Sequence, residues 1–304
     1  MLSTEYLARY RSYFENCGGQ AASAGGHLWR VYQRMAIPIG PASALYDLDA
    51  VEARGLFRRL PTAVLIRHTA GFHLQVKSWY AVLADHFEDL SELDGKRRNE
   101  VRRGLRNCTV ARIGAKELVE KGGAEVFRSV AAAHTGKGFS SFDAAKYRRS
   151  MLQNEGFEDI WHFWGVFGPD GVLIAYAQNA IYGSVEVNYS SIRLHPDYLG
   201  LYPMYALIYE MNRHYLGAGK ADYVNDGFRS LLHDTNIQDF LIRKFGFKKV
   251  GVPMCIRYRP LFGILLKPLL LAYPFWPLLP GKVRSLLFQE KYHRCTTQEM
   301  EQQE

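Results

Sequence analysis

The chain has 304 residues, of which 48% are hydrophobic and 22% are charged. These proportions are ordinary for a globular protein, and they exclude a collagen-like, coiled-coil or largely disordered chain. The length predicts about two domains. The formal net charge of +8 leaves two interpretations open. The protein either has a basic face with no special partner, or binds an acidic one such as nucleic acid, anionic lipid or a phosphorylated substrate.

The cysteines argue for a reduced, intracellular setting. Cys17, Cys108, Cys255 and Cys295 are widely spaced and form no CxxC pair, which argues against a zinc site and a disulfide framework. The histidines also lack the i, i+4 spacing of a helical zinc motif, so we expect no metal. Residues 1–19 contain no apolar stretch of signal-peptide length. The sequence therefore predicts a cytoplasmic protein.

The first 150 residues have a weak pattern of secondary structure. Residues 1–60 are interrupted by glycines and predict no long helix. Short strands are expected at Ala63–Arg67 and Phe72–Val76. A strand at Val110–Ile113 and a helix at Ala115–Ala133, weakened by its two adjacent glycines, follow later.

Lys96–Arg106, with the sequence KRRNEVRRGLR, predicts a strongly basic helix. Val101 and Leu105 mark its apolar side at helical spacing. The i, i+4, i+8 spacing places three arginines on one face, and these are Arg98, Arg102 and Arg106. Such a face can bind the phosphates of a tRNA, a nucleotide-linked substrate or an anionic lipid; the alternative is a solvated surface.

From about residue 160 the pattern becomes clear and predicts the order β-β-β-α-β-α-β-β. The expected elements are, in chain order, strands Ile160–Phe167, Val172–Ile181 and Val185–Leu194, a helix from Pro203 to Leu216, strand Ala221–Asn225, a helix from Thr235 to Phe245, and strands Phe247–Val250 and Met254–Tyr258. Turn residues at Gly168–Gly171 separate the first two strands. Thr235 and Gln238 have the spacing of a capping box at the start of the second helix.

This order, together with FLIRKFGFKKVG at Phe240–Gly251, resembles the GNAT superfamily of N-acyltransferases over roughly a third of the chain. The resemblance implies an α/β (α+β) fold with a mixed, mostly antiparallel sheet flanked by helices. The basic helix ahead of this segment is similar to the K/R-R-N-x-x-R/K stretch of Fem-type aminoacyltransferases and their BioF2-like relatives. We expect a partly GNAT-like region at 1–150, which would make two GNAT-like halves, a GNAT-like domain at 151–260 and an apolar tail at 261–304.

The resemblance implies that Val185–Met211 cradles the acyl donor, which in GNAT enzymes is acyl-coenzyme A. The free N–H groups of a helix N-terminus stabilise its pyrophosphate. The implied donor-binding residues are Arg193, Leu194, Leu199, Gly200, Leu201, Tyr202 and Asn236. Here bulky Tyr202 replaces the second small residue of the family loop, and Pro203 removes an N–H donor. An aminoacyl-tRNA is therefore the alternative donor.

Acyl transfer to an amine requires a base, and polar residues at strand ends are the candidates. These are Asp226, His195 and His233. The structural alternatives are a turn residue beside Gly227 for Asp226, and a loop histidine for each of the other two. The tyrosine that protonates the leaving thiolate in many GNAT enzymes is replaced by Ile242. Arg229 is a candidate for binding an anionic substrate, or a solvated arginine.

The tail Leu261–Pro280 is almost wholly apolar, yet four prolines and Lys267 make a continuous transmembrane helix an unfavourable interpretation. Aromatic residues within it and basic residues on both sides are typical of peripheral attachment. We therefore expect residues 257–291 to meet an anionic membrane surface. The alternative is that the tail covers an apolar groove of the protein itself.

These features predict a cytoplasmic N-acyltransferase, peripheral at the inner face of the membrane. It would move an acyl or aminoacyl group to an amine, for example on a cell-envelope precursor. The rival is a non-catalytic protein on a GNAT scaffold that binds an anionic lipid or glycan precursor. An RNA-binding module is a third interpretation, which the lack of stacking aromatics within the basic helix disfavours.

Overall fold

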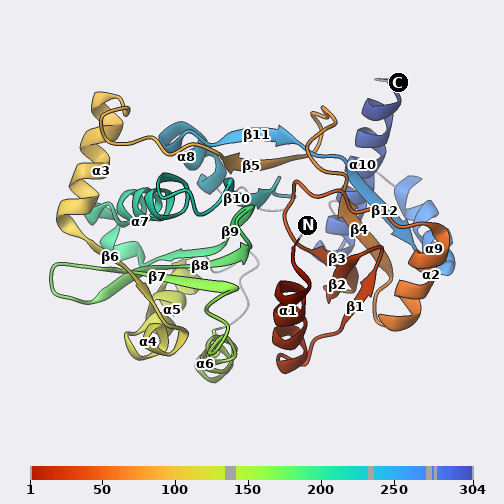
Figure 1. The fold of residues 1–304 in the computed structure, drawn as a ribbon, viewed down its shortest axis with the longest axis horizontal. Coiled ribbons are helices and arrows are strands. Elements are labelled where there is room, and N and C mark those ends of the chain that lie inside the picture. The colour runs from red at the N-terminus through yellow and green to blue at the C-terminus, as the bar shows by residue number, and fades with distance from the viewer. Residues whose placement is uncertain (1, 134–141, 232–235, 272–275, 277–278, 303–304) are drawn as a thin grey trace. The chain divides into compact units, whose positions relative to one another are not determined.

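The computed structural model describes residues 2–133, 142–231, 236–271, 276 and 279–302. They contain one five-stranded sheet, in the order β1-β2-β3-β4-β12, and one seven-stranded sheet, in the order β11-β5-β10-β9-β8-β7-β6. Helices flank both sheets (Figure 1). Most neighbouring strands are antiparallel, and β3–β4 and β9–β10 are parallel. The predicted class of fold is confirmed.

The chain forms two compact units. The five-strand unit comprises Met1–Ala81, Phe228–Thr235 and Lys249–Glu304, and the seven-strand unit comprises Val82–Gly227 and Asn236–Lys248. The chain therefore crosses between the units several times. Strand β12 (Met254–Tyr258) illustrates this, because it pairs over five residues with β4 (Leu65–Thr69). Local pattern cannot reveal such a long-range pairing.

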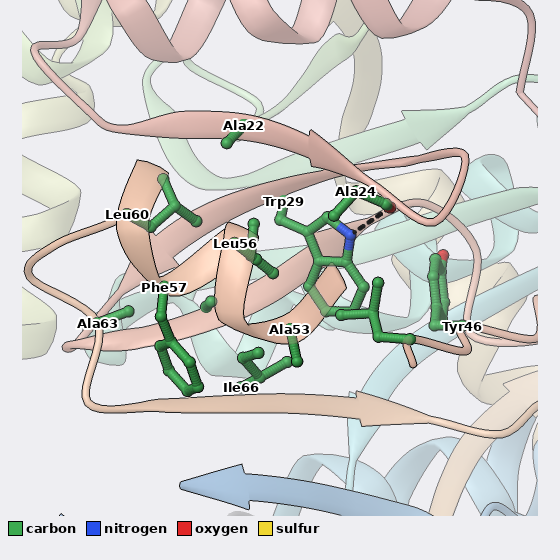
Figure 2. Close-up of a cluster of buried hydrophobic side chains, with 12 residues drawn as sticks. Ala22, Ala24, Trp29, Tyr46, Ala53, Leu56, Phe57, Leu60, Ala63 and Ile66 are labelled. Atoms are coloured by element: carbon green, nitrogen blue, oxygen red, sulfur yellow. Dashed lines mark hydrogen bonds between the residues drawn. The ribbon is translucent and has the colours of Figure 1, made fainter. Parts of the chain in front are cut away.

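The five-strand unit has its core between the sheet and helix α2. Its elements are α1 (Thr4–Asn16), β1 (Ala21–Ala24), β2 (His27–Tyr32), β3 (Met35–Ile39), α2 (Ala50–Arg59), β4, β12, α9 (Pro260–Leu271) and α10 (Gly281–Glu301). Figure 2 shows Leu56 and Phe57 of α2 beside Trp29 and Ile66 of the sheet. The indole Nε1 of Trp29 is fully buried and donates to the carbonyl of Ala24 at 3.0 Å. This pairing removes the cost of burying an unbonded polar group.

The seven-strand unit follows the predicted order of elements closely. These are β5 (Tyr80–Ala84), α3 (Gly95–Asn107), β6 (Thr109–Ile113), α4 (Ala115–Glu120), α5 (Gly123–Ala133), α6 (Ala144–Leu152), β7 (Trp161–Phe167), β8 (Leu173–Tyr182), β9 (Glu186–Leu194), the 3-10 helix η1 (Pro196–Leu201), α7 (Pro203–Asn212) with its π-helical end (Arg213–Gly217), β10 (Tyr223–Phe228), α8 (Asn236–Phe245) and β11 (Lys248–Gly251). In Figure 1 helices α4–α6 lie on one face of β7–β9, and α7 lies on the other.

Two expectations for the strands are wrong. The strand expected at Phe72–Val76 is irregular, and the regular strand is β5, at residues 80–84. In this segment Val76 contacts Gly251 so closely that a Cβ on that glycine would lie 1.8 Å from the carbonyl oxygen of Val76. Residues 1–60, which have little pattern, nevertheless form α1, β1–β3 and α2, because strands of four to six residues carry too few alternations to stand out.

Candidate functional site

Strands β9 and β10 pair in parallel over only three residue pairs, and then the pairing ends. The pairs are Glu186–Tyr223, Val187–Val224 and Asn188–Asn225. Beyond them β9 continues for six residues to Leu194 without pairing with β10, which itself ends at Phe228. We call the residues at this divergence the fork, and they are Glu186, Asn188, Tyr223, Asn225 and Asp226.

Glu186 is the buried acid of the fork. Its side chain is 2% exposed, and the hydroxyl of Tyr223 donates to its Oε2 at 2.7 Å. Asn225 and Asn188 donate to its Oε1 at 3.1 and 3.4 Å. Directly paired residues project to the same face of a sheet, which explains why these four side chains meet. Their hydrogen bonds offset the cost of burying a carboxyl group.

Asp226 follows Asn225 and therefore points to the opposite face, towards α7 and α8. It is half-buried. Burial raises its pKa to about 7, and a hydrogen bond with Gln238 of α8 opposes that rise. On the same face, burial, Tyr215 and then Asp226 raise the pKa of the Tyr189 hydroxyl. A carboxyl that titrates near neutral pH can accept a proton from an amine under physiological conditions.

A neutral polar network lies on this same face, under the end of α7. The Tyr215 hydroxyl accepts from Trp164 Nε1 at 2.8 Å and from Asn179 Nδ2 at 3.4 Å. Its own proton is therefore directed to Nδ1 of His162, 2.9 Å away. Burial, then Arg112, lower the pKa of His162 to about 3. This histidine is neutral at physiological pH, and its Nδ1 already accepts a hydrogen bond.

The structure does not bring His195 to the fork. Asp226 is level with Tyr189 in the register, whereas His195 comes six residues further along β9, which corresponds to roughly 20 Å. Its Nδ1 accepts from the backbone N–H of Asp197 at 3.3 Å and thereby caps η1. The two predicted bases therefore cannot act on the same atom, and His195 has a structural task. His233, the third candidate, lies outside the described residues.

The loop between β9 and α7, expected to hold the donor, offers few free N–H groups. Tyr202 has φ +65° and is the N-cap of α7 without a side-chain capping bond. Pro203 has no N–H, and those of Tyr205 and Ala206 bond to the carbonyl of Tyr202 at 3.1 and 3.4 Å. Among the first four residues of α7, Met204 alone has an N–H outside these bonds. This helix end is a poor cradle for a pyrophosphate.

The other predicted donor residues lie around this loop in varied surroundings. Leu199 is 56% exposed, and Gly200 has open space where a Cβ would be. Leu201 accepts a weak bond at its carbonyl from the thiol of Cys108 at 3.5 Å. Arg193, next to Leu194 near the end of β9, lies over the ring of Phe127, 5.5 Å from its centroid. Asn236 is the exposed first residue of α8.

The basic helix α3 packs against the start of α7. A Cβ on Gly104 would come within 2.7 Å of the carbonyl oxygen of Tyr202 and 3.0 Å of the N of Ala206. The guanidinium of Arg103 lies 4.5 Å above the ring centroid of Tyr202. Only a residue without a side chain permits this approach. The basic helix and the donor loop, separated by about 90 residues in sequence, are thus neighbours.

Some arginines of α3 are held by partners within the protein, and others are exposed and available to a ligand. Arg98 donates to the carbonyls of Ser91 and Leu93, at 3.3 and 2.8 Å. The Arg97 side chain is 20% exposed and forms ion pairs with Glu88 and Asp94. Arg102 and Arg106 are exposed, and neither has an ion pair with another described residue. Of the predicted phosphate-binding row, these two remain available.

Arg229 lies in the five-strand unit and is held by its neighbours there. It donates to the carbonyl of Ser78 at 3.0 Å and lies 4.7 Å from the centroid of the Tyr292 ring. The predicted helix cap at Asp234 and Thr235 falls outside the described residues. Among those that are described, no group of three or more His, Cys, Asp or Glu side chains could hold a metal ion.

The apolar tail both packs on the protein and exposes side chains. Leu266, Trp276 and Leu287 form a buried cluster. Leu261 and Ile264 of α9 are 78% and 62% exposed. In the part of the chain that the structure describes, none of the helices has the length and apolarity needed to cross a bilayer.

The sequence did not single out Glu186, Tyr223 or Asn225, and it singled out Gln238 only as part of a capping box with Thr235. A weak signal for Glu186 exists, because an acid between Val185 and Val187 at the start of a strand has to be paired when the strand is central. The partners could not be identified in the same way, since their meeting depends on the register between β9 and β10.

Neither a family model nor a curated protein sequence matches the chain. Among solved structures, the fold is similar to that of FemX, with a TM-score of 0.51 and 12% identity over 86% of this chain and 93% of that one. It is also similar to L-PGS from Bacillus licheniformis, with a TM-score of 0.52 and 14% identity over 96% and 98% of the two chains. Identities this low concern the fold alone. The predicted Fem-type fold is confirmed.

Proposed function

We propose that the chain is an N-acyltransferase in which Asp226 is the general base for an acceptor amine at the fork. The observation that carries the proposal is the half-buried carboxyl of Asp226, whose pKa is raised to about 7 by burial at the point where β9 and β10 diverge. A base is most effective when its pKa lies near the working pH. The FemX-like fold supports the same class of reaction.

The reaction follows from this position. The amine nitrogen attacks the carbonyl carbon of the donor ester or thioester, and its proton passes to the carboxylate of Asp226. The tetrahedral intermediate then collapses, an amide bond remains, and the alkoxide or thiolate leaves with its electron pair. Ile242 cannot protonate that leaving group, so the leaving oxygen or sulfur takes its proton from water, and the proton on Asp226 returns to solvent when the product leaves. No covalent enzyme intermediate is required.

For the donor we favour an aminoacyl-tRNA over an acyl-coenzyme A. Two observations support this choice. The start of α7 has few free N–H groups for a pyrophosphate, and the exposed Arg102 and Arg106 of α3 lie on the helix packed beside the same loop. A row of cations suits a phosphate backbone better than one pyrophosphate.

The test compares donors in one assay. Purified protein is incubated with small amines and with acetyl-coenzyme A, a long-chain acyl-coenzyme A or a mixture of aminoacyl-tRNAs, and amide formation is measured. We expect transfer from aminoacyl-tRNA, weakened several-fold at about 0.15 M salt by Arg102→Gln with Arg106→Gln. Arg58→Gln, an exposed arginine on α2, is the matched control. Transfer from acyl-coenzyme A alone would reverse the choice of donor, and no transfer from any donor would favour a non-catalytic scaffold.

We propose further that the acceptor amine is carried by an envelope precursor at a membrane surface, which the protein meets through α9. Leu261 and Ile264 are exposed on this helix. Apolar side chains that insert into a bilayer, together with basic residues that attract anionic lipids, attach a protein peripherally to a membrane. Co-sedimentation with anionic vesicles tests this. Leu261→Asp with Ile264→Asp should abolish binding, whereas Val51→Asp, at a site that is 68% exposed on α2, should not. Equal loss in both variants would contradict the assignment.

A further inference from the structure

Two arginines lie on one row across the five-stranded sheet. Arg30 of β2 pairs directly with Ile37 of β3. The next strand, β4, pairs with β3 at Met35–Leu65 and Ala36–Ile66, and continuing this register brings Arg67 level with Ile37. Directly opposed residues share a face, so both guanidinium groups leave the same side of the sheet, with their Cα atoms about 10 Å apart.

Arg67 is held in place but not neutralised. It is partly exposed, and its Nη1 donates to Oε1 of Gln289 on α10 at 2.8 Å. Gln289 is itself 4% exposed and is anchored by donating from Nε2 to the carbonyl of Ser285. Burial lowers the pKa of Arg67 to about 10, and the Tyr32 hydroxyl opposes the fall. The group thus carries a desolvated charge with only neutral partners.

Arg30 is the second cation of the row. Its guanidinium lies 4.9 Å from the ring centroid of Phe14 on α1 and 5.2 Å from that of Tyr32. Two aromatic rings position the group and leave its N–H donors free to face a ligand. In the described part of the chain, neither Arg30 nor Arg67 forms an ion pair with a carboxylate.

We propose that Arg30 and Arg67 form a binding site for a dianionic phosphate group on this face of the sheet, between α1 and α10. Two like charges on a partly desolvated face are costly unless an anion joins them. A phosphate monoester matches the two positive charges and offers three acceptor oxygens to the planar guanidinium donors. The site lies on the face opposite α2 and does not depend on the proposed acyl transfer.

The phosphate group could belong to a soluble metabolite or to a lipid headgroup, and two probes separate these sources. Glycerol 3-phosphate, at millimolar concentration, is titrated into the full-length protein, and the heat of binding is measured by calorimetry. The chloride concentration is the same in both solutions, so that general effects of salt on the protein do not contribute. Vesicles containing phosphatidic acid are tested in parallel by sedimentation. We expect saturable binding of at least one probe.

Substitutions of Arg30 and Arg67 test whether these two arginines are responsible for the binding of the probe. Arg67→Gln and Arg30→Gln should each weaken binding at least about tenfold, because each removes charge-assisted hydrogen bonds. Arg58→Gln, on the opposite face of the same unit, should leave the affinity unchanged. If Arg67→Gln impairs folding, Arg30→Gln still tests the row, since Arg30 makes no hydrogen bond that the sheet requires. Unchanged affinity in a folded Arg30→Gln variant, or no binding of either probe, would overturn the proposal.

Discussion

The two ends of strand β9 differ in what their polar groups do. At its start, Glu186 and Asp226 place two carboxyl groups on opposite faces of the fork, and burial moves the pKa of Asp226 to about 7. At its far end, His195 and the carbonyl of Tyr202 are occupied by local caps that shape η1 and α7. One end retains a group able to exchange a proton, and the other uses its polar groups for local structure.

This difference shows why residue type alone is a weak guide to a base. A histidine is the usual candidate, yet His195 accepts a backbone N–H and is roughly 20 Å along the strand from the fork. An aspartate is ordinarily ionised at neutral pH, yet Asp226 is placed where burial makes its proton exchangeable. The surroundings decide the role.

Removing the carboxyl of Asp226 should have the largest effect. We expect Asp226→Asn to reduce kcat/KM for acyl transfer by about 10²-fold or more, because a general base contributes that much. The measurement is steady-state transfer with the donor that the donor comparison selects. Asp222→Asn, an exposed aspartate four residues earlier, is the matched control, and equal losses in both variants would remove Asp226 from the reaction.

The same substitution should stabilise the fold above neutral pH. A carboxyl whose pKa is raised from 3.8 to about 7 holds its proton more tightly in the native state than in the unfolded one. Its unfavourable contribution is therefore absent below about pH 4, grows between pH 4 and 7, and is complete above pH 7. Urea unfolding at pH 8 should show Asp226→Asn gaining roughly 1–3 kcal/mol over wild type, and no gain at pH 4.

Glu186 allows a test of the second carboxyl group of the fork, which is expected to have a structural role. Glu186→Met keeps the length of the side chain but removes the acceptor for the Tyr223 hydroxyl and for the amides of Asn225 and Asn188. We expect the free energy of unfolding to fall by about 1–3 kcal/mol, the usual cost of a buried polar group that loses its match. Chemical denaturation checks this. Glu117→Met, at an exposed site on α4, should change stability by less than about 0.5 kcal/mol, and similar losses in both variants would contradict a special role for the buried carboxyl.

The smallest effect is expected at the far end of β9. His195→Ala removes the acceptor for the N–H of Asp197 and should cost about 1 kcal/mol of stability, as the loss of a helix cap does. The rate of acyl transfer should stay within about threefold of wild type. His195→Asn, which retains a capping acceptor, should restore the stability. A loss of activity comparable to that of Asp226→Asn would show that His195 is a catalytic residue, and the two ends of β9 would then not differ in function.

Local pattern predicted the elements from β7 to β12 well, although β12 belongs to the five-strand unit. The β-β-β-α-β-α-β-β order, the basic helix and the break between α4 and α5 all follow from period, glycine position and charge. Asp226 stands out in the sequence because it directly follows the strand expected at Ala221–Asn225, although β10 continues to Phe228. By contrast, the exchange of strands between units depends on pairings such as β12 with β4, and the meeting of Glu186 with Tyr223 depends on register. These are long-range events without a local signal.

The most direct test of Asp226 as the base is the pH dependence of kcat/KM between pH 5 and 9, measured for wild type and Asp226→Asn with the same donor and acceptor. We expect wild-type kcat/KM to rise with pH through an apparent pKa near 7, where the carboxyl loses its proton. We expect Asp226→Asn to retain only a low rate that does not rise in this way. The same limb in both proteins would assign the titration to another group, and Asp226 would not be the base.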